Sequence, residues 1–432
     1  MAYDEPGFRD EPGFRRDSVY QPGSFSVSDY PSDAADTTLG LSRRPLSSAA
    51  LDDVFDDPDH GEPGRDRMGV HAGWELALLL AVAAVGFLLY REHSDLLKGA
   101  QLRDLLVLLA GFGFVALGAA ISLRASAPNL AVGPIAVAAA IFYATQGDRG
   151  VVSTTAVAAV IALVAGVVLA ILVVGFHVPG WAASLAGALA VVVWIQRHDD
   201  TVSVLGEYDP SRHAYYLAAG FAAVSVIGGL LGSIKSVRRA IGRFRPVSDP
   251  ARRRGGVAAG LTAAALIAST VLASIGGVLL AAREDSVGPG GYFESTGLAL
   301  TGLAIGAALV GGTSAFGRRG GVFGTLLAVT LLIAVRQMGI AENWRLSDFA
   351  VAAVTVGVGL VVTRLVEAMG RPRSAGELED TDDGWMSTGS AAPASSWSVP
   401  RQDSWSSSLP AQPSAGHTGD LWADDRWGGR SE

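Results

Sequence analysis

The sequence contains no cysteine among its 432 residues. Without thiols the chain forms no disulfide, no thiol nucleophile and no cysteine-based metal site. The HExxH, GxSxG and GK[ST] patterns of common hydrolases and nucleotide-binding enzymes are absent as well. We therefore expect that the protein is not an enzyme and that it carries no catalytic residue, metal or cofactor.

Charge is scarce in the middle of the chain, between about residues 74 and 366, where long apolar runs follow one another. No Asp, Glu, Lys or Arg lies near the centre of any run. Charge-free runs of this length are typical of helices that cross a bilayer, so the sequence predicts an all-α polytopic membrane protein. Ion-coupled transporters usually carry an intramembrane carboxylate or histidine, which makes a secondary transporter the least favoured of the transport hypotheses.

Ten apolar segments are present, and we expect about ten transmembrane helices. They span Trp74–Tyr90, Leu105–Leu123, Leu130–Ala144, Val151–Phe176, Trp181–Ile195, Ala214–Ile234, Val257–Ala282, Leu298–Gly312, Val322–Val335 and Phe349–Val366.

The third segment differs from the others because it is short and carries Asn129 and Pro134 near its start. We expect it to be kinked or to cross only part of the bilayer, with its irregular backbone covered by protein. The fourth and fifth segments are separated by His177–Gly180 (HVPG), a turn signal.

Two acidic tails flank this region. Residues 1–70 carry 15 acidic and seven basic residues, and residues 371–432 carry ten acidic and five basic ones. Both are rich in Ser, Asp and Pro, a composition that predicts disorder. The expected organisation is a disordered tail (1–70), a transmembrane domain (71–370) and a second disordered tail (371–432), whose five tryptophans are candidate anchors for a partner.

Lysine and arginine predict the orientation. With the N-terminus in the cytoplasm, 16 of these residues in and around the spans face the cytoplasm and nine face the other side. Eight of the 16 lie in one loop, Lys235–Arg254. We therefore expect a multi-pass protein of the cytoplasmic (inner or plasma) membrane with both termini in the cytoplasm.

Mild polar side chains are scattered through the spans, and they admit two interpretations. They either line a path for a neutral polar solute, or they bond back to helix carbonyls and hold helices together, which is the commoner role. The residues are Asn129, Ser225, Thr262, Ser269, Thr270, Ser274, Thr301, Thr330 and Thr355.

The stretch Gly311–Thr325 (GGTSAFGRRGGVFGT) links the eighth and ninth segments. Its arginines predict a position outside the hydrocarbon core, and its glycines allow a sharp reversal and close backbone approach. On local chemistry alone it is equally well an ordinary glycine-rich turn between two spans.

Three stretches in this order resemble the permease subunits of bacterial ABC importers for ribose, other simple sugars and branched-chain amino acids. Ser122–Pro134 resembles the family's Asp/Asn-Leu-Ser-Val-Gly-Ser helix start through Asn129, Leu130, Val132 and Gly133, whereas Ala131 and Pro134 depart from it. Ala273–Arg283 resembles the span after the family's coupling loop. In Gly311–Thr325 the residues in register with the family pattern are Gly311, Gly312, Thr313, Ser314, Gly317, Gly320, Gly324 and Thr325.

The resemblance implies a helical permease that pairs with a second copy and is driven by a cytoplasmic ATP-binding subunit, with an extracytoplasmic solute-binding protein delivering the substrate. It places the ATPase contact in the loop 236–256, where Ala240, Ile241 and Gly242 match the family and Arg243 and Phe244 do not. The residues expected at this contact are Arg238, Arg239, Ile241 and Gly242.

The sequence therefore predicts a permease subunit that moves a small polar solute, with a simple sugar as the leading candidate, and that uses a separate ATPase. The lipid bilayer is its environment, and no nucleic-acid partner is expected. The alternative is an inactive permease-like scaffold whose tails recruit cytoplasmic partners, which the altered coupling loop and the tryptophan-containing tail favour.

Overall fold

A computed structural model describes residues 68–198, 200–234, 237, 256–288, 296–315, 317 and 320–370. Both predicted tails lie outside these residues except for 68–70. The described chain is helical apart from one two-stranded ribbon. Its main helices are α2 (Met68–Glu92), α3 (Gly99–Arg124), α4 (Val132–Gln146), α5 (Val151–Ala170), α6 (Gly180–Ile195), α7 (Ala214–Ser233), α9 (Gly256–Ala281), α10 (Leu298–Val310), α11 (Gly324–Ala341) and α12 (Asp348–Gly370).

Each of the ten predicted segments coincides with one of these helices. Within the described residues, eight helices are long and apolar enough to cross a membrane, whereas α4 and α10 are shorter. A π-helical turn, η3 (Ile171–Gly175), ends the fourth segment, and α6 begins at Gly180, so the predicted break at 177–180 is confirmed. The protein is therefore an all-α polytopic membrane protein, as predicted.

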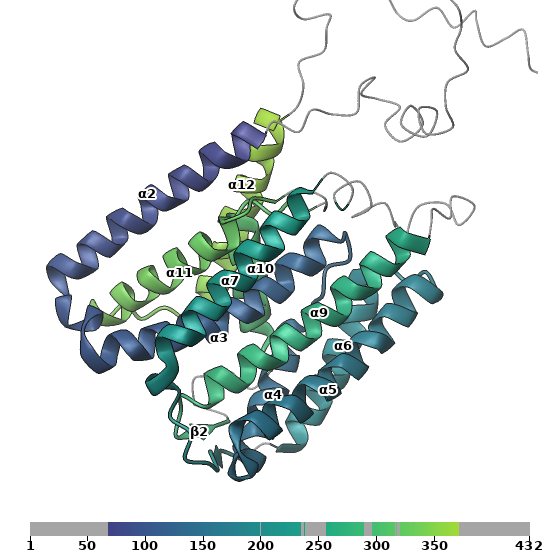
Figure 1. Ribbon diagram of the computed structural model, residues 1–432, viewed down its shortest axis with the longest axis horizontal. Coiled ribbons are helices and arrows are strands. Elements are labelled where there is room, and N and C mark those ends of the chain that lie inside the picture. Colours follow the sequence, from purple (N-terminus) through teal and green to yellow (C-terminus); the bar gives the residue numbers. More distant parts are fainter. Residues whose placement is uncertain are drawn as a thin grey trace, which may run out of the picture. The chain divides into compact units, whose positions relative to one another are not determined.

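Successive helices run in opposite directions, so their connections alternate between two ends of the bundle (Figure 1). We call residues 311–323 the glycine loop and name one end after it. The ends of α3, η3, α7 and α10 lie at that end, as do the starts of α6, α9 and α11 (Figure 1). The opposite end carries an antiparallel ribbon of β1 (Val202–Ser203) and β2 (Ser286–Val287), and we call it the ribbon end.

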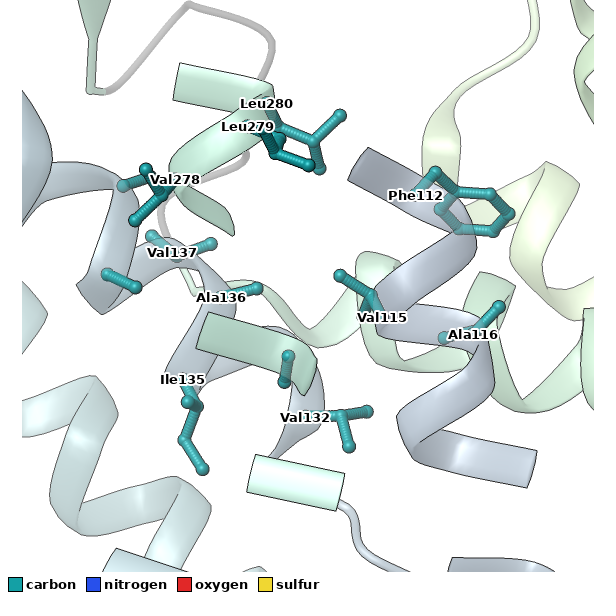
Figure 2. Close-up of a cluster of buried hydrophobic side chains, with 14 of the residues drawn as sticks. Phe112, Val115, Ala116, Val132, Ile135, Ala136, Val137, Val278, Leu279 and Leu280 are labelled. Carbon is teal, nitrogen blue, oxygen red and sulfur yellow. The ribbon is translucent and has the colours of Figure 1, made fainter. Parts of the chain in front are cut away.

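The core forms where α3, α4 and α9 pack against one another (Figure 2). Small residues bring these helices close together. A Cβ at Gly118 would lie 2.7 Å from the carbonyl oxygen of Ser269, and a Cβ at Gly277 would overlap the backbone of Ala136. Because lipid is as apolar as leucine, such close backbone packing is what holds helices together in a bilayer.

The outer helices expose apolar side chains where a water-soluble protein would place polar ones. On α5, Val160 and Ile161 are 60% and 55% exposed, and Leu189 on α6 is 56% exposed. Continuous apolar surface of this kind is favourable only against lipid, which supports a multi-pass membrane location.

Charged pairs at the ribbon end explain why two helices extend beyond the predicted spans. Asp104, in the second turn of α3, accepts from Arg283 Nε at 2.6 Å and from Nη2 at 3.1 Å. Arg336, which we expected to end the ninth span, lies inside α11 and pairs with Asp348 at 2.7 Å. Hydropathy alone ends a span at such residues, but an oppositely charged partner from elsewhere in the chain lets the helix continue through them.

Candidate functional site

Helix α4 starts inside the bundle, and the chain reaches that start through a buried, non-helical segment from Ala125 to Ala131. Asn129 is fully buried there and supports the turn with three hydrogen bonds. Its Oδ1 accepts from the Ala131 amide at 3.0 Å, its Nδ2 donates to Ser269 Oγ at 3.0 Å, and its own amide donates to Ser122 Oγ at 3.1 Å. The expectation that irregular backbone here is covered by protein is confirmed.

Replacing Asn129 with alanine should lower the free energy of unfolding by roughly 1–3 kcal/mol, because the Ala131 amide loses its cap and Ser269 loses its donor. Reversible unfolding of the purified full chain in mixed micelles measures this change. The double variant Asn129→Ala/Ser269→Ala should cost less than the two single changes together, since both remove the same bond. Strictly additive costs would show that the bond contributes nothing to stability.

The starts of α4 and α10 meet, although α3, which precedes α4, ends at the glycine-loop end and β2, which precedes α10, lies at the ribbon end. A Cβ at Gly133 would overlap the carbonyl oxygen of Gly297 and lie 2.7 Å from the Thr301 amide. The Gly133 amide donates to Thr301 Oγ1 at 3.0 Å, and Gly297 adopts a left-handed conformation with φ +71°. Two short helices are thus joined backbone to backbone at a point that only glycine permits.

The glycine loop reverses the chain between α10 and α11. Gly311 and Gly324 pack against each other so closely that a Cβ on Gly324 would overlap the carbonyl oxygen of Gly311. Gly312 has φ +81°, and Trp74 Nε1 on α2 donates to the Val310 carbonyl at 2.8 Å. The predicted sharp reversal is therefore present, and α2 covers it.

Thr313 and Ser314, two further residues of the predicted motif, are buried at 0% and 3% exposure. The Thr313 carbonyl accepts from Thr363 Oγ1 on α12 at 3.4 Å, so the last turns of α12 also contact the glycine loop.

Two charged side chains from different helices bind the second half of the glycine loop. Arg124, the last residue of α3, donates from Nη2 to the Gly321 carbonyl. Glu75, in α2, accepts at Oε1 from the amides of Phe323 at 2.7 Å and Gly324 at 3.1 Å. Because these amides open α11, the carboxylate acts as a helix N-cap supplied by another helix. Gly320 and Gly321 leave no room for a Cβ beside Arg124 and Glu75.

At the glycine-loop end the structure brings together two of the predicted stretches, Ser122–Pro134 and Gly311–Thr325. A Cβ at Gly317 would overlap Ser126 Oγ, in the segment that follows α3, and Gly320 lies against Arg124. Asn129 and Gly133 belong to the same segment but lie deeper, at the start of α4. The predicted coupling residues Arg238, Arg239, Ile241 and Gly242 lie outside the described residues, so the ATPase contact stays a prediction.

Sequence reasoning missed Trp74 and Glu75, and it treated Arg124 only as a topology charge. The one available signal was their position in the sequence. Each is a polar or amphipathic residue at the glycine-loop end of a span, where helix caps and interfacial anchors are common. Nothing in the sequence linked them to a loop region 197–249 residues further along.

Four of the nine scattered polar residues bond to carbonyls of their own helix. Thr262, Thr270, Thr330 and Thr355 donate to carbonyls three or four residues earlier, at 2.7–3.1 Å. Asn129, Ser269 and Thr301 join helices. These seven residues therefore bond back to helix carbonyls or join helices, as the commoner of the two interpretations predicted. Ser225 and Ser274 make no such bond among the described residues, and they stay candidates for lining a solute path.

The described residues include no group of three or more His, Cys, Asp or Glu that could hold a metal ion. Comparison with protein-family models, with curated proteins and with solved structures finds no match.

Proposed function

We propose that this chain is the permease subunit of an ABC transporter and moves a small polar solute, with a simple sugar as the leading candidate. ATP hydrolysis then belongs to a separate cytoplasmic subunit, a second permease copy completes the pathway, and a solute-binding protein delivers the substrate. The proposal rests on the family resemblance of the sequence motifs and on a helical, apolar architecture of the kind that transporters use.

One observation carries the proposal furthest. Two of the three stretches that carry the resemblance, Ser122–Pro134 and Gly311–Thr325, are separated by about 180 residues in sequence, yet Arg124 and Ser126 contact Gly321 and Gly317 directly. Motifs that belong to one functional unit are expected to meet in this way. α7 ends and α9 begins at the same end of the bundle, and the proposed coupling residues lie between these two helices in the sequence.

The proposed location is the cytoplasmic membrane, with the glycine-loop end facing the cytoplasm. The positive-inside rule supports this orientation, because Arg124 and the eight bases of Lys235–Arg254 all lie at that end in sequence order. Both tails would then be cytoplasmic.

The test is affinity purification of the full chain from its native membrane. We expect an ATP-binding subunit to co-purify with the wild type and to be reduced at least tenfold by Arg238→Glu/Arg239→Glu, because reversed charge opposes the contact. Arg371→Glu/Arg373→Glu is the control, since it changes the charge equally near the same end. No ATP-binding subunit with the wild type, or equal recovery with all three chains, would refute the proposal.

A second candidate, the inactive permease-like scaffold, is favoured by the engagement of interior polar groups. Of the nine polar residues predicted in the spans, four bond within their own helices and three join helices. Few hydroxyls are then left to contact a solute. Deleting residues 1–67 and 371–432 separates the two functions. A permease keeps its ATP-binding partner without the tails, whereas a scaffold loses its cytoplasmic partners.

A further inference from the structure

A groove opens on the side of the bundle at the glycine-loop end, between α7 and α9. Both helices pack against α3, but they scarcely contact each other, and the positions of all three can be followed in Figure 1. The space between them has a volume of about 270 Å³. Its walls are mainly apolar and include Leu117, Ile121, Gly228, Leu231, Leu261 and Ala268.

Three polar side chains from three helices line this groove, and each has unused hydrogen-bonding capacity. Arg124 donates from Nη2 to Gly321, but its Nε has no partner, and its Nη1 lies 3.0 Å from where a Cβ of Gly232 would stand. Gly232 is itself a groove residue. Ser225 on α7 and Thr325 on α11 are each 3% exposed, and neither hydroxyl has a hydrogen bond within the described chain.

The charge of the groove favours an anion. Arg124 is its cationic side chain, and Thr325, in the first turn of α11, adds a hydroxyl donor. The nearest opposing charge is Glu75, whose Oε1 is occupied by the amides of Phe323 and Gly324. Thr262, the fourth polar residue in the wall, is bonded to Ala258 and contributes only its methyl group.

The shape of the groove favours a ligand with a hydrocarbon part. Leu231 in its wall is 52% exposed on the outer side of α7, so the opening faces the space that lipid fills. Arg124 is the last residue of α3 and Thr325 is the second residue of α11, so the polar end of the groove lies at the helix ends, where headgroups meet acyl chains. Ser225 lies eight residues before the end of α7, roughly 12 Å deeper, at the level of the acyl chains.

We propose that this groove binds an anionic phospholipid from the leaflet at the glycine-loop end. The phosphate accepts hydrogen bonds from Arg124 and from the Thr325 hydroxyl, and an acyl chain lies deeper between α7 and α9, along Leu117 and Ile121 and beside Ser225. A bound lipid would contact α3, α7, α9 and α11 and would fill the space between α7 and α9, which scarcely contact each other. This inference does not depend on the proposed transport function.

The test is binding of dioctanoyl phosphatidylglycerol to the purified full chain in neutral detergent, followed by native mass spectrometry and by the thermal midpoint. We expect binding that dioctanoyl phosphatidylcholine does not reproduce. Arg124→Gln should weaken it about tenfold or more through loss of charge-assisted bonds. Gly228→Leu should abolish it by filling the groove, because a Cβ at Gly228 meets nothing within 4 Å and the protein can accommodate the side chain.

Gly220→Leu is the matched control, since Gly220 lies two turns earlier on α7, has equally open surroundings and does not line the groove. It should bind phosphatidylglycerol like the wild type. Equal binding of both lipids, or binding that survives both Arg124→Gln and Gly228→Leu, would overturn the proposal. Inorganic phosphate that competes fully with the lipid and shifts the thermal midpoint equally would also overturn it, in favour of a site for a soluble anion.

Discussion

Replacing Gly133 with alanine should prevent the chain from accumulating as a folded protein. The added Cβ would overlap the carbonyl oxygen of Gly297 and come within 2.7 Å of the Thr301 amide, both of which are backbone atoms. Side chains can rotate away from a clash, but two helix starts can only separate. We expect a loss of about 3 kcal/mol or more, which is a large share of the roughly 5–15 kcal/mol that stabilises a typical protein.

The measurement is the yield of monodisperse protein in size-exclusion chromatography, with the thermal midpoint of whatever remains folded. Gly357→Ala is the control, because Gly357 also lies within a helix, α12, and a Cβ there meets nothing within 4 Å. Normal yield and stability for Gly133→Ala would mean that the starts of α4 and α10 are not in contact in the membrane.

The second large effect concerns the two charges on the glycine loop. Arg124→Gln should lower the free energy of unfolding by about 2–3 kcal/mol, since it removes the charge that binds Gly321 and that attracts Glu75. This loss of stability is smaller than the loss expected from breaking a fully buried ion pair, because the side chains of Arg124 and Glu75 are partly exposed. Glu75→Gln should have a similar cost through loss of the charged cap on α11.

A double-mutant cycle separates a shared role from two independent ones. Arg124→Gln/Glu75→Gln should cost at least about 0.5 kcal/mol less than the sum of the single changes, because both residues hold the same loop. Arg336→Gln, which breaks the pair with Asp348 at the ribbon end, should combine additively with Arg124→Gln. Equal additivity in both combinations would show that Arg124 and Glu75 do not act on one loop.

The limits of sequence reasoning are clear at α4. Asn129 and Pro134 predicted an irregular start, because an amide and an imino acid cannot continue a lipid-exposed helix without compensation. The identity of the compensating groups, Ser122, Ser269 and Thr301, was not predictable. They come from three other helices, and hydroxyl residues of this kind occur in almost every span.

The amino-acid sequence by itself determined the number and order of the helices, since the insertion of an apolar run into lipid depends on its own length and composition. Only the tertiary structure decided that Trp74, Glu75 and Arg124 converge on the glycine loop and that α4 and α10 meet at Gly133 and Gly297. Hydropathy carries no information about which helices are neighbours, because lipid favours all of them equally. The neighbours are chosen by close packing at small residues and by a few polar contacts.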